Sequence, residues 1–356
     1  MPASLPALHR VVLAAGAALA LAGLGVWARR ASAPLAAPAP AASGGTVVRA
    51  TRPLMGSVFE IAVWAPAGRE PEAAESARAG LDLIAALEEK ISEWKPSSEI
   101  SAVNAAAGGE PVKVGPETRE LVGAMVEWSR RTGGAFDVTG GPLFRRWERA
   151  RKEKNLPPGA EVDALRAAVG WERIELGSGA VRLAKPGMSI GTGAIGKGWA
   201  ADKAGAFLEG RGFPDYIVDA GGDLRIGGSR GGEPWTVAVK EPRREGCLAT
   251  IAAAPGGIAT SGDYERFWFV DGVRYSHILD LRTGWPARGL ASVTIIAEDG
   301  TAADALATAV FAMGAEKGLE FANGLKGVEA MLVRDDGGEL FTRGLRRNGD
   351  RLEVIR

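Results

Sequence analysis

The segment from residue 188 to residue 202 has the composition of a loop that binds phosphate. It passes through four glycines, whose missing β-carbons let the backbone approach a bulky ligand closely. A helix expected over residues 198–210 would direct its free N–H groups and the positive end of its dipole at this loop, and Lys197 adds a mobile positive charge. The glycines are Gly191, Gly193, Gly196 and Gly198. The alternative is a glycine-rich turn packed tightly between a strand and a helix.

Two general nucleotide-binding motifs nearly fit the same segment. Residues 191–196 match the G-x-G-x-x-G pattern of dinucleotide-binding loops, and Asp219 lies at the end of a later strand-like run. Residues 191–197 also resemble a Walker A loop, but Gly198 stands where a Ser or Thr should hold magnesium. Each match alone is weak, so the class of ligand depends on the rest of the chain.

Oxygen-bearing side chains at three other places could hold a metal ion or a polar substrate. Asp304 and Thr308 are four residues apart on an expected helix, so their oxygens share one face, as Mg²⁺ ligands would. The alternative is an acidic residue that only stabilises the helix dipole. Asp219 and Asp223 flank a glycine turn, which is also typical of a tight hairpin. Residues 258–264 bring hydroxyls and a carboxylate into one loop, as an Asx or ST turn would.

His277 is the only histidine of the part expected to fold, and Asp280 and Arg282 follow it closely. Imidazole is the one side chain here whose ordinary pKa lies near neutrality, so His277 is a candidate general base. The alternative is a histidine that only supports the structure. The other histidine, His9, lies near the N-terminus, and Cys247 is the single cysteine. These counts exclude an intramolecular disulfide, a cysteine metal cluster and a histidine-rich zinc site.

The elements that must position these residues are helices and strands intermixed along the chain. Hairpin-like strand pairs outnumber βαβ units, so we predict an α+β fold with mixed sheets and helices packed around them. Helices are expected at residues 70–94, 98–104, 116–131, 144–154, 160–169, 198–210, 301–313 and 316–323. Strands are expected at residues 47–52, 57–63, 173–176, 181–183, 216–219, 235–240, 248–252, 267–270, 293–296, 330–333 and 339–342.

The first 45 residues are expected to be separate from this fold. Residues 11–27 form an uncharged run of Ala, Leu, Gly and Val, and a Pro/Ala linker follows it. We interpret residues 1–45 as a signal peptide or membrane anchor plus its linker, handled by export or membrane-insertion machinery, and residues 46–356 as one domain. The protein is therefore expected to be exported, and to be periplasmic or anchored to the outer face of the inner membrane. Its 43 basic and 43 acidic side chains balance, so nothing indicates a nucleic-acid partner.

Seven ordered segments together make the chain resemble the ApbE family, the FAD:protein FMN transferases, from about residue 47 to about residue 343. They are residues 55–57 (MGS), 136–143 (FDVTGGPL), 193–198 (GAIGKG), 219–225 (DAGGDLR), 258–264 (IATSGDY), 277–284 (HILDLRTG) and 303–308 (ADALAT). The departures are small. Val138 and Leu281 stand where the family often has Pro, and Gly140 stands where it often has Val.

The resemblance implies an ApbE-like fold in which FAD lies over the glycine loop and the helix after it. The FAD contacts that it implies are Met55, Trp94, Ala135, Phe136, Asp137, Gly191, Lys197 and Ile278. It also implies that Mg²⁺ is held by the backbone oxygen of Ala194 and the side chains of Asp304 and Thr308. His277 and Asp304 would then be the catalytic residues, with His277 as the base. Trp94 or Phe136 could cover the isoalloxazine ring.

The chemistry of FAD agrees with these implied roles. Its pyrophosphate carries two negative charges, which Mg²⁺ and Lys197 would neutralise while a hydroxyl attacks and AMP leaves. We therefore expect an enzyme that moves FMN from FAD to a Thr or Ser of a partner protein in a redox system. One alternative is an FAD pyrophosphatase, in which water replaces the hydroxyl. Another is a protein without this activity, either a non-catalytic FAD-binding protein or a dinucleotide oxidoreductase.

Overall fold

The main sheet begins with a long hairpin of β1 (Gly45–Leu54) and β2 (Ser57–Pro66) in the computed structural model, which describes residues 44–355. This sheet has 8 strands in the order β1-β2-β6-β7-β10-β15-β16-β17, and every neighbouring pair is antiparallel. The other strands are β6 (Tyr216–Ala220), β7 (Leu224–Gly227), β10 (Gly256–Gly262), β15 (Leu290–Ala297), β16 (Glu329–Arg334) and β17 (Glu339–Phe341).

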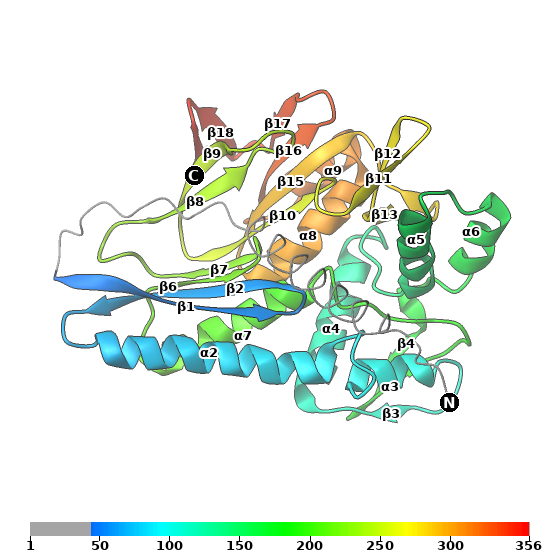
Figure 1. Cartoon of the computed structure of the whole chain (residues 1–356), viewed down its shortest axis with the longest axis horizontal. Coiled ribbons are helices and arrows are strands. Elements are labelled where there is room, and N and C mark those ends of the chain that lie inside the picture. Colours follow the sequence, from blue (N-terminus) through cyan, green and yellow to red (C-terminus); the bar gives the residue numbers. More distant parts are fainter. Residues whose placement is uncertain (1–43, 356) are drawn as a thin grey trace, which may run out of the picture.

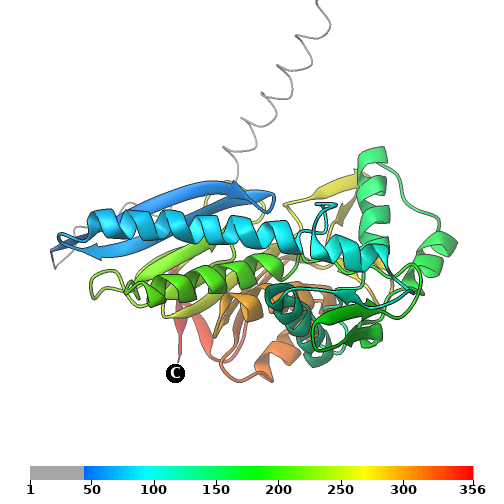
Figure 2. The same cartoon turned by 90° about the horizontal axis from the view of Figure 1, so that it is seen from below.

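Four helices cover one face of the main sheet (Figures 1 and 2). They are α2 (Glu70–Ile91), α7 (Gly196–Gly210), α8 (Gly300–Met313) and α9 (Ala315–Asn323). In α2, apolar residues at three- and four-residue steps, such as Leu81, Ile84 and Leu87, are buried against the sheet. The residues of α8 are buried on nearly all sides, so it is the central helix of this layer. The candidate site residues on α7 and α8 are therefore held on buried elements.

A second, smaller sheet covers the opposite face. It has the order β18-β19-β9-β8, formed by β8 (Trp235–Lys240), β9 (Cys247–Ala253), β18 (Leu345–Asn348) and β19 (Arg351–Val354). Alternate residues of β8, namely Trp235, Val237 and Val239, are buried in the core between the two sheets. In this small sheet β19 and β9 run parallel, whereas the neighbouring pairs are antiparallel.

The remaining elements form one end of the molecule, shown at the right of Figure 1. Its helices are α3 (Glu99–Ala105), α4 (Pro116–Arg131), α5 (Gly141–Glu153), α6 (Gly159–Arg166) and a 3₁₀ turn, η1 (Trp171–Arg173). Its strands are β3 (Val112–Lys113), β4 (Ile174–Leu176), β5 (Ala180–Leu183), β11 (Phe267–Val270), β12 (Val273–Ser276), β13 (Leu279–Asp280) and β14 (Trp285–Pro286). A cluster of aromatic rings from Trp147, Trp268, Tyr275 and Trp285 joins α5 to the β11–β12 hairpin.

The predicted α+β class is confirmed, with three informative differences in the elements. Residues 258–262, within the 258–264 segment that was expected to be a loop, belong to the central strand β10, because Ile258 and Ala259 are buried in the two different cores beside it. Helix α2 ends at Ile91 rather than at residue 94, because Ser92 adopts an extended backbone. Helix α5 begins at Gly141, where a proline at its start favours an earlier first turn than residue 144. Strands β3, β7, β12, β13, β14, β18 and β19 were not predicted.

The expected signal or anchor segment, residues 1–45, lies almost entirely outside the described residues. Within residues 44–355 no helix is long and apolar enough to cross a membrane. The first strand starts at Gly45.

Candidate active site

The N-terminal ends of α7 and α8 lie against each other. A β-carbon at Gly198 would collide with the backbone carbonyl oxygen of Gly300, so this glycine is required by the close approach of the two helices. The N–H of Gly198 donates a hydrogen bond of 3.1 Å to Oδ2 of Asp304. Of the two interpretations of the glycines, a phosphate-binding loop or tight packing, tight packing therefore applies to Gly198. Gly193, in contrast, is exposed, and a β-carbon there would meet nothing within 4 Å.

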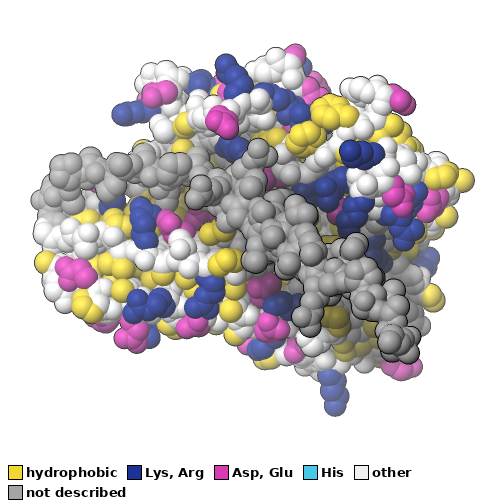
Figure 3. Space-filling model, in the orientation of Figure 1, with side chains coloured by type: hydrophobic (Ala, Val, Ile, Leu, Met, Phe, Trp, Pro, Cys, Tyr) yellow, Lys and Arg dark blue, Asp and Glu magenta, His cyan; other side chains and the backbone are white. Residues whose placement is uncertain are grey.

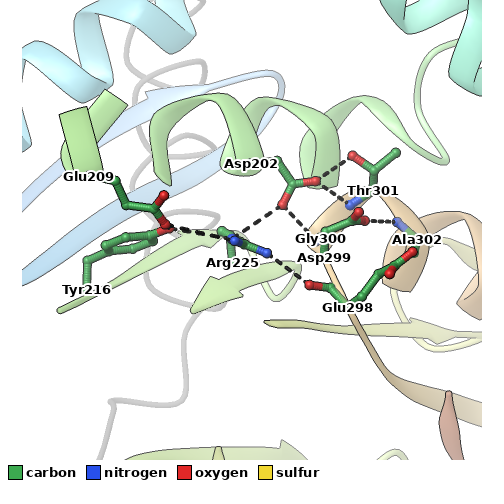
Figure 4. Close-up of polar contacts among 9 residues, drawn as sticks. All are labelled: Asp202, Glu209, Tyr216, Arg225, Glu298, Asp299, Gly300, Thr301 and Ala302. Carbon is green, nitrogen blue, oxygen red and sulfur yellow. Dashed lines mark hydrogen bonds and ion pairs between the residues drawn. The ribbon is translucent and has the colours of Figure 1, made fainter. Parts of the chain in front are cut away.

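Asp202 fixes the position of α8 from the side of α7 (Figure 4). Its two carboxylate oxygens accept hydrogen bonds of 2.8 Å from the N–H groups of Gly300 and Thr301, and the Thr301 hydroxyl donates a third bond of 2.5 Å. Helix α8 also has its own N-cap, because Asp299 accepts a hydrogen bond of 2.7 Å from the N–H of Ala302. Burial raises the pKa of Asp202. Since α8 already has a cap, Asp202 serves to join the two helices.

Arg225 of β7 extends this network to the sheet. Its guanidinium lies 3.8 Å from Oδ1 of Asp202 and donates a hydrogen bond of 3.0 Å to the carbonyl of Glu298 (Figure 4). The hydroxyl of Tyr216 donates a hydrogen bond of 2.7 Å to Glu209 and lies 3.5 Å from Arg225, and burial raises the pKa of Tyr216 to about 12. Strands β6 and β7, which carry the Asp219–Asp223 turn between them, are thereby tied to α7 and α8.

One ammonium group at this junction feels the charge of three carboxylates. Lys197 forms an ion pair with Asp223, and the charges of Asp304 and Asp219 also act on it. Burial alone would lower the pKa of Lys197, but these carboxylates raise it. Burial raises the pKa of Asp304, and it raises the pKa of Asp219 to about 6. The negative charge of Asp223 raises both pKa values further. The cluster holds more negative than positive charge, which a bound cation would balance.

The residues predicted to hold Mg²⁺ fit a cation of that kind. The Asp304 carboxylate is 5% exposed and has no ion-pair partner within residues 44–355, and Thr308 follows it one helical turn later. The Thr308 hydroxyl lies 3.3 Å from the Ser261 hydroxyl of β10. Ala194 is half-buried in the turn just before α7. Among the described residues no three His, Cys, Asp or Glu side chains gather as a metal site, so this one depends on hydroxyl and backbone oxygens.

Glu93, which the sequence analysis did not identify, holds the glycine loop in place. Its carboxylate accepts hydrogen bonds from the backbone N–H and the hydroxyl of Thr192. The loop is also hydrogen-bonded to the 136–143 segment, because the N–H of Gly191 donates a hydrogen bond of 2.8 Å to the carbonyl of Val138. Burial raises the pKa of Glu93, while Arg145 and Arg266 act in the opposite direction. A lone acidic residue at the end of an amphipathic helix gives no sequence signal for this role.

The residues expected to contact FAD lie around this loop in different environments. The carboxylate of Asp137 accepts hydrogen bonds from the N–H and hydroxyl of Thr139 and from the N–H of Trp171, so it shapes its own turn. Phe136 is buried in the main core, whereas Trp94 is 71% exposed, which favours Trp94 as the ring that could cover the flavin. Ala135, Ile278 and the half-buried Met55 belong to or pack on the same core as Phe136.

His277 follows directly after β12, and its side chain is exposed. Its backbone N–H donates a hydrogen bond of 3.0 Å to the carbonyl of Arg266. Although the imidazole keeps solvent-accessible area, the protein packed around it, together with the positive charge of Arg266, lowers the pKa of His277 to about 4. Asp280 pairs with Arg282 at 2.8 Å instead of orienting the imidazole. His277 is thus neutral at neutral pH and can accept a proton.

Comparison with known proteins agrees with this geometry. The model of the ApbE family matches residues 55–332. An FAD:protein FMN transferase of Vibrio cholerae is 33% identical over 301 residues, which cover 82% of this chain and 89% of that protein. The crystal structure of the ApbE protein from Thermotoga maritima has a TM-score of 0.77 at 33% identity, and covers 84% of this chain and 97% of that one. The flavin transferase ApbE of Vibrio cholerae has a TM-score of 0.74 at 29% identity, with 84% and 98% covered. The chain therefore belongs to the ApbE family of transferases.

Proposed function

We propose that this protein is an Mg²⁺-dependent FAD:protein FMN transferase, which moves FMN from FAD to a Thr or Ser hydroxyl of a partner protein and releases AMP. The observation that carries this proposal is the placing of Lys197 and Asp304 at the joined N-terminal ends of α7 and α8, with Thr308 one helical turn after Asp304. The charge of Lys197 also acts on His277. A pyrophosphate placed there would face N–H groups, an ammonium group and a candidate cation site.

The transfer is a displacement at phosphorus. The acceptor hydroxyl oxygen bonds to the phosphorus of the FMN half of FAD, the bond from that phosphorus to the bridging oxygen breaks, and AMP carries away the electron pair. His277 takes the hydroxyl proton, because its imidazole is neutral at neutral pH and the residue is exposed. Lys197 stabilises the charge that develops on the leaving phosphate. A bound Mg²⁺ ion would supply further charge neutralisation of the pyrophosphate.

FAD pyrophosphatase activity is the second candidate, and the exposure of His277 favours it. An imidazole that water can reach is able to take a proton from water as well as from a hydroxyl. The products would then be AMP and free FMN. A protein that binds FAD without cleaving it would leave the Lys197 and Asp304 cluster without a chemical role.

For the cellular setting, we propose that residues 46–356 act as one ApbE-like flavin transferase domain outside the cytoplasm. The uncharged run at residues 11–27 and the Pro/Ala linker after it support export, to the periplasm or to the outer face of the inner membrane. The acceptor would be a redox protein on the same side of the membrane.

One assay separates these activities. The enzyme is incubated with FAD, Mg²⁺ and a library of peptides that each contain one Thr, and both AMP and peptide-bound flavin are measured. AMP together with covalent flavin supports the transferase, AMP with free FMN supports the pyrophosphatase, and FAD binding without AMP contradicts both. The Asp304→Asn variant is the matched control, because an amide can still accept the hydrogen bond of Gly198 but lacks the charge for a cation.

A further inference from the structure

The β11–β12 hairpin exposes an unusual amount of apolar surface next to the proposed active site. Phe267 is 37% and Phe269 is 53% exposed, and their rings meet edge to face with centroids 5.8 Å apart. Arg274 pairs with Phe269 across the hairpin, and its guanidinium lies 3.9 Å from the Phe267 ring centroid. Phe267, Phe269 and Arg274 lie on the outer face of the hairpin, and we call them the aromatic strip. Trp268 and Tyr275 lie on the inner face, where they pack against Trp147 of α5.

A cavity of about 400 Å³ lies beside the aromatic strip. The residues that line it include Arg243, Arg274, Arg288, Asp263, Asp335 and Ser276. Arg243 pairs with both aspartates, at 2.5 and 3.2 Å, while Arg288 has no carboxylate partner within residues 44–355. Three arginines against two aspartates leave one positive charge in excess. Figure 3 shows Lys and Arg side chains next to hydrophobic ones on the surface over the hairpin and α5.

Two polar groups of this cavity wall are left without hydrogen-bond partners. Nη1 of Arg274 and Oγ of Ser276 are both buried and find none among the described residues, and Ser276 as a whole is 2% exposed. Both can donate, and a guanidinium nitrogen can only donate. A buried donor without a partner costs stability, so this site suits a ligand that brings a hydrogen-bond acceptor. A carboxylate matches both the missing acceptor and the excess positive charge.

We propose that the aromatic strip and this cavity bind the polypeptide that accepts the flavin, through a segment that combines apolar side chains with a carboxylate. The inference rests on the proposed transferase function, which requires a protein to approach His277. Ser276 is the last residue of β12 and lines the cavity, and the exposed His277 follows it directly. A segment seated in the cavity would therefore lie next to the candidate base, which is not itself part of the cavity wall.

The test uses a library of 15-residue peptides with one central Thr and random flanks, labelled by the full-length enzyme in the presence of FAD. Wild type is expected to label peptides enriched in Asp or Glu together with apolar residues. Phe269→Ser is expected to lower kcat/KM for a selected peptide by about tenfold, the size of a moderate interface hot spot. Arg288→Glu is expected to shift the selection from acidic toward basic residues. In both variants the affinity for FAD should stay within about twofold of wild type.

Matched controls and contrary outcomes complete the test. Leu176→Ser removes another exposed apolar side chain, 37% exposed against 53% for Phe269, from strand β4. Lys326→Glu reverses an exposed charge on the loop after α9. If Phe269→Ser and Arg288→Glu label the same peptides as well as these controls do, the docking surface is wrong while the transferase function stands. If wild type cleaves FAD yet labels no peptide, the transferase function itself is contradicted, and the docking surface falls with it.

Discussion

Asp202 and Asp304 each accept hydrogen bonds from the N-terminal N–H groups of the other's helix. Asp202 of α7 accepts the N–H groups of Gly300 and Thr301, and Asp304 of α8 accepts the N–H of Gly198. This reciprocal contact places the candidate metal ligand on α8 at a fixed distance from Lys197 on α7. The carboxylate of Asp304 is thereby held before any cation arrives, which reduces the cost of ordering the site.

Replacing Asp202 should loosen the metal site more than the fold. Asp202→Ala is expected to cost about 0.5–2 kcal/mol of stability, the usual value of a lost helix cap, and to weaken Mg²⁺ binding at least tenfold. Asp299→Ala removes the local cap of α8 at a similar cost, but it leaves the link to α7 intact and should not change metal affinity. Urea unfolding and calorimetric Mg²⁺ titration of both variants measure the two effects. Equal metal affinities in the two variants would show that Asp202 is only a cap.

Asp304→Asn should abolish the stabilisation of the protein by Mg²⁺. A ligand that binds only the folded state raises its stability by about 2.7 kcal/mol at a concentration of 100 times Kd, so Mg²⁺ should raise the Tm of wild type. The variant should unfold at or above the metal-free wild-type temperature, because the burial that raises the pKa of Asp304 also makes its charge costly. Mg²⁺-dependent turnover should be lost as well. The metal assignment fails if Mg²⁺ shifts the Tm of the variant as much as that of wild type.

Substitution of Gly193, in the turn before α7, and of Gly198, in the first turn of α7, should have different effects on FAD affinity and on Tm. Gly193→Val places a side chain in open space where a phosphate is proposed to bind, so FAD affinity should fall while Tm is kept. Gly198→Ala drives a β-carbon into the Gly300 carbonyl, so the Tm should fall by several degrees. Thermal unfolding and FAD titration of the folded fraction separate the two effects. A Gly193→Val protein that binds FAD like wild type would show that the open space is not used by the ligand.

The sequence identified candidate ligand-facing residues, but not the residues that support them. Lys197, Asp304 and Thr308 lie in short local motifs, and local spacing is enough to assign a shared helical face. Asp202 and Glu93 act through partners about 100 positions away along the chain, so no local pattern marks them. Residues 258–264 have the composition of a loop, yet most of them belong to strand β10, because hydroxyl-rich turns and short buried strands have similar composition. The α+β fold class was predicted correctly, because the spacing of hairpin-like strands and the periodicity of amphipathic helices are enough to indicate it.

His277 allows binding and chemistry to be separated. If it is the base, His277→Gln should bind FAD and Mg²⁺ like wild type, while the transfer rate falls by about 100- to 10,000-fold, the usual range for general-base catalysis. Because its pKa is lowered to about 4, the active neutral form is present above that value. The kcat/KM of wild type should therefore rise with pH through about 4 and level off below 6.5, the ordinary histidine pKa, and the variant should lack this limb.

The lowered pKa of His277 also predicts how the free energy of unfolding depends on pH. Between about pH 4 and 6.5 the unfolded chain binds a proton at His277 that the folded protein does not, so the stability contribution of this residue is lost as pH falls through that window. His277→Gln should remove this slope, which urea unfolding at a series of pH values measures. A role only in holding the flavin would instead lower FAD affinity together with the rate and would leave the acid limb of kcat/KM in place. Asp263 and Asp280 are poor substitutes as the base, because each is already paired with an arginine, Arg243 or Arg282.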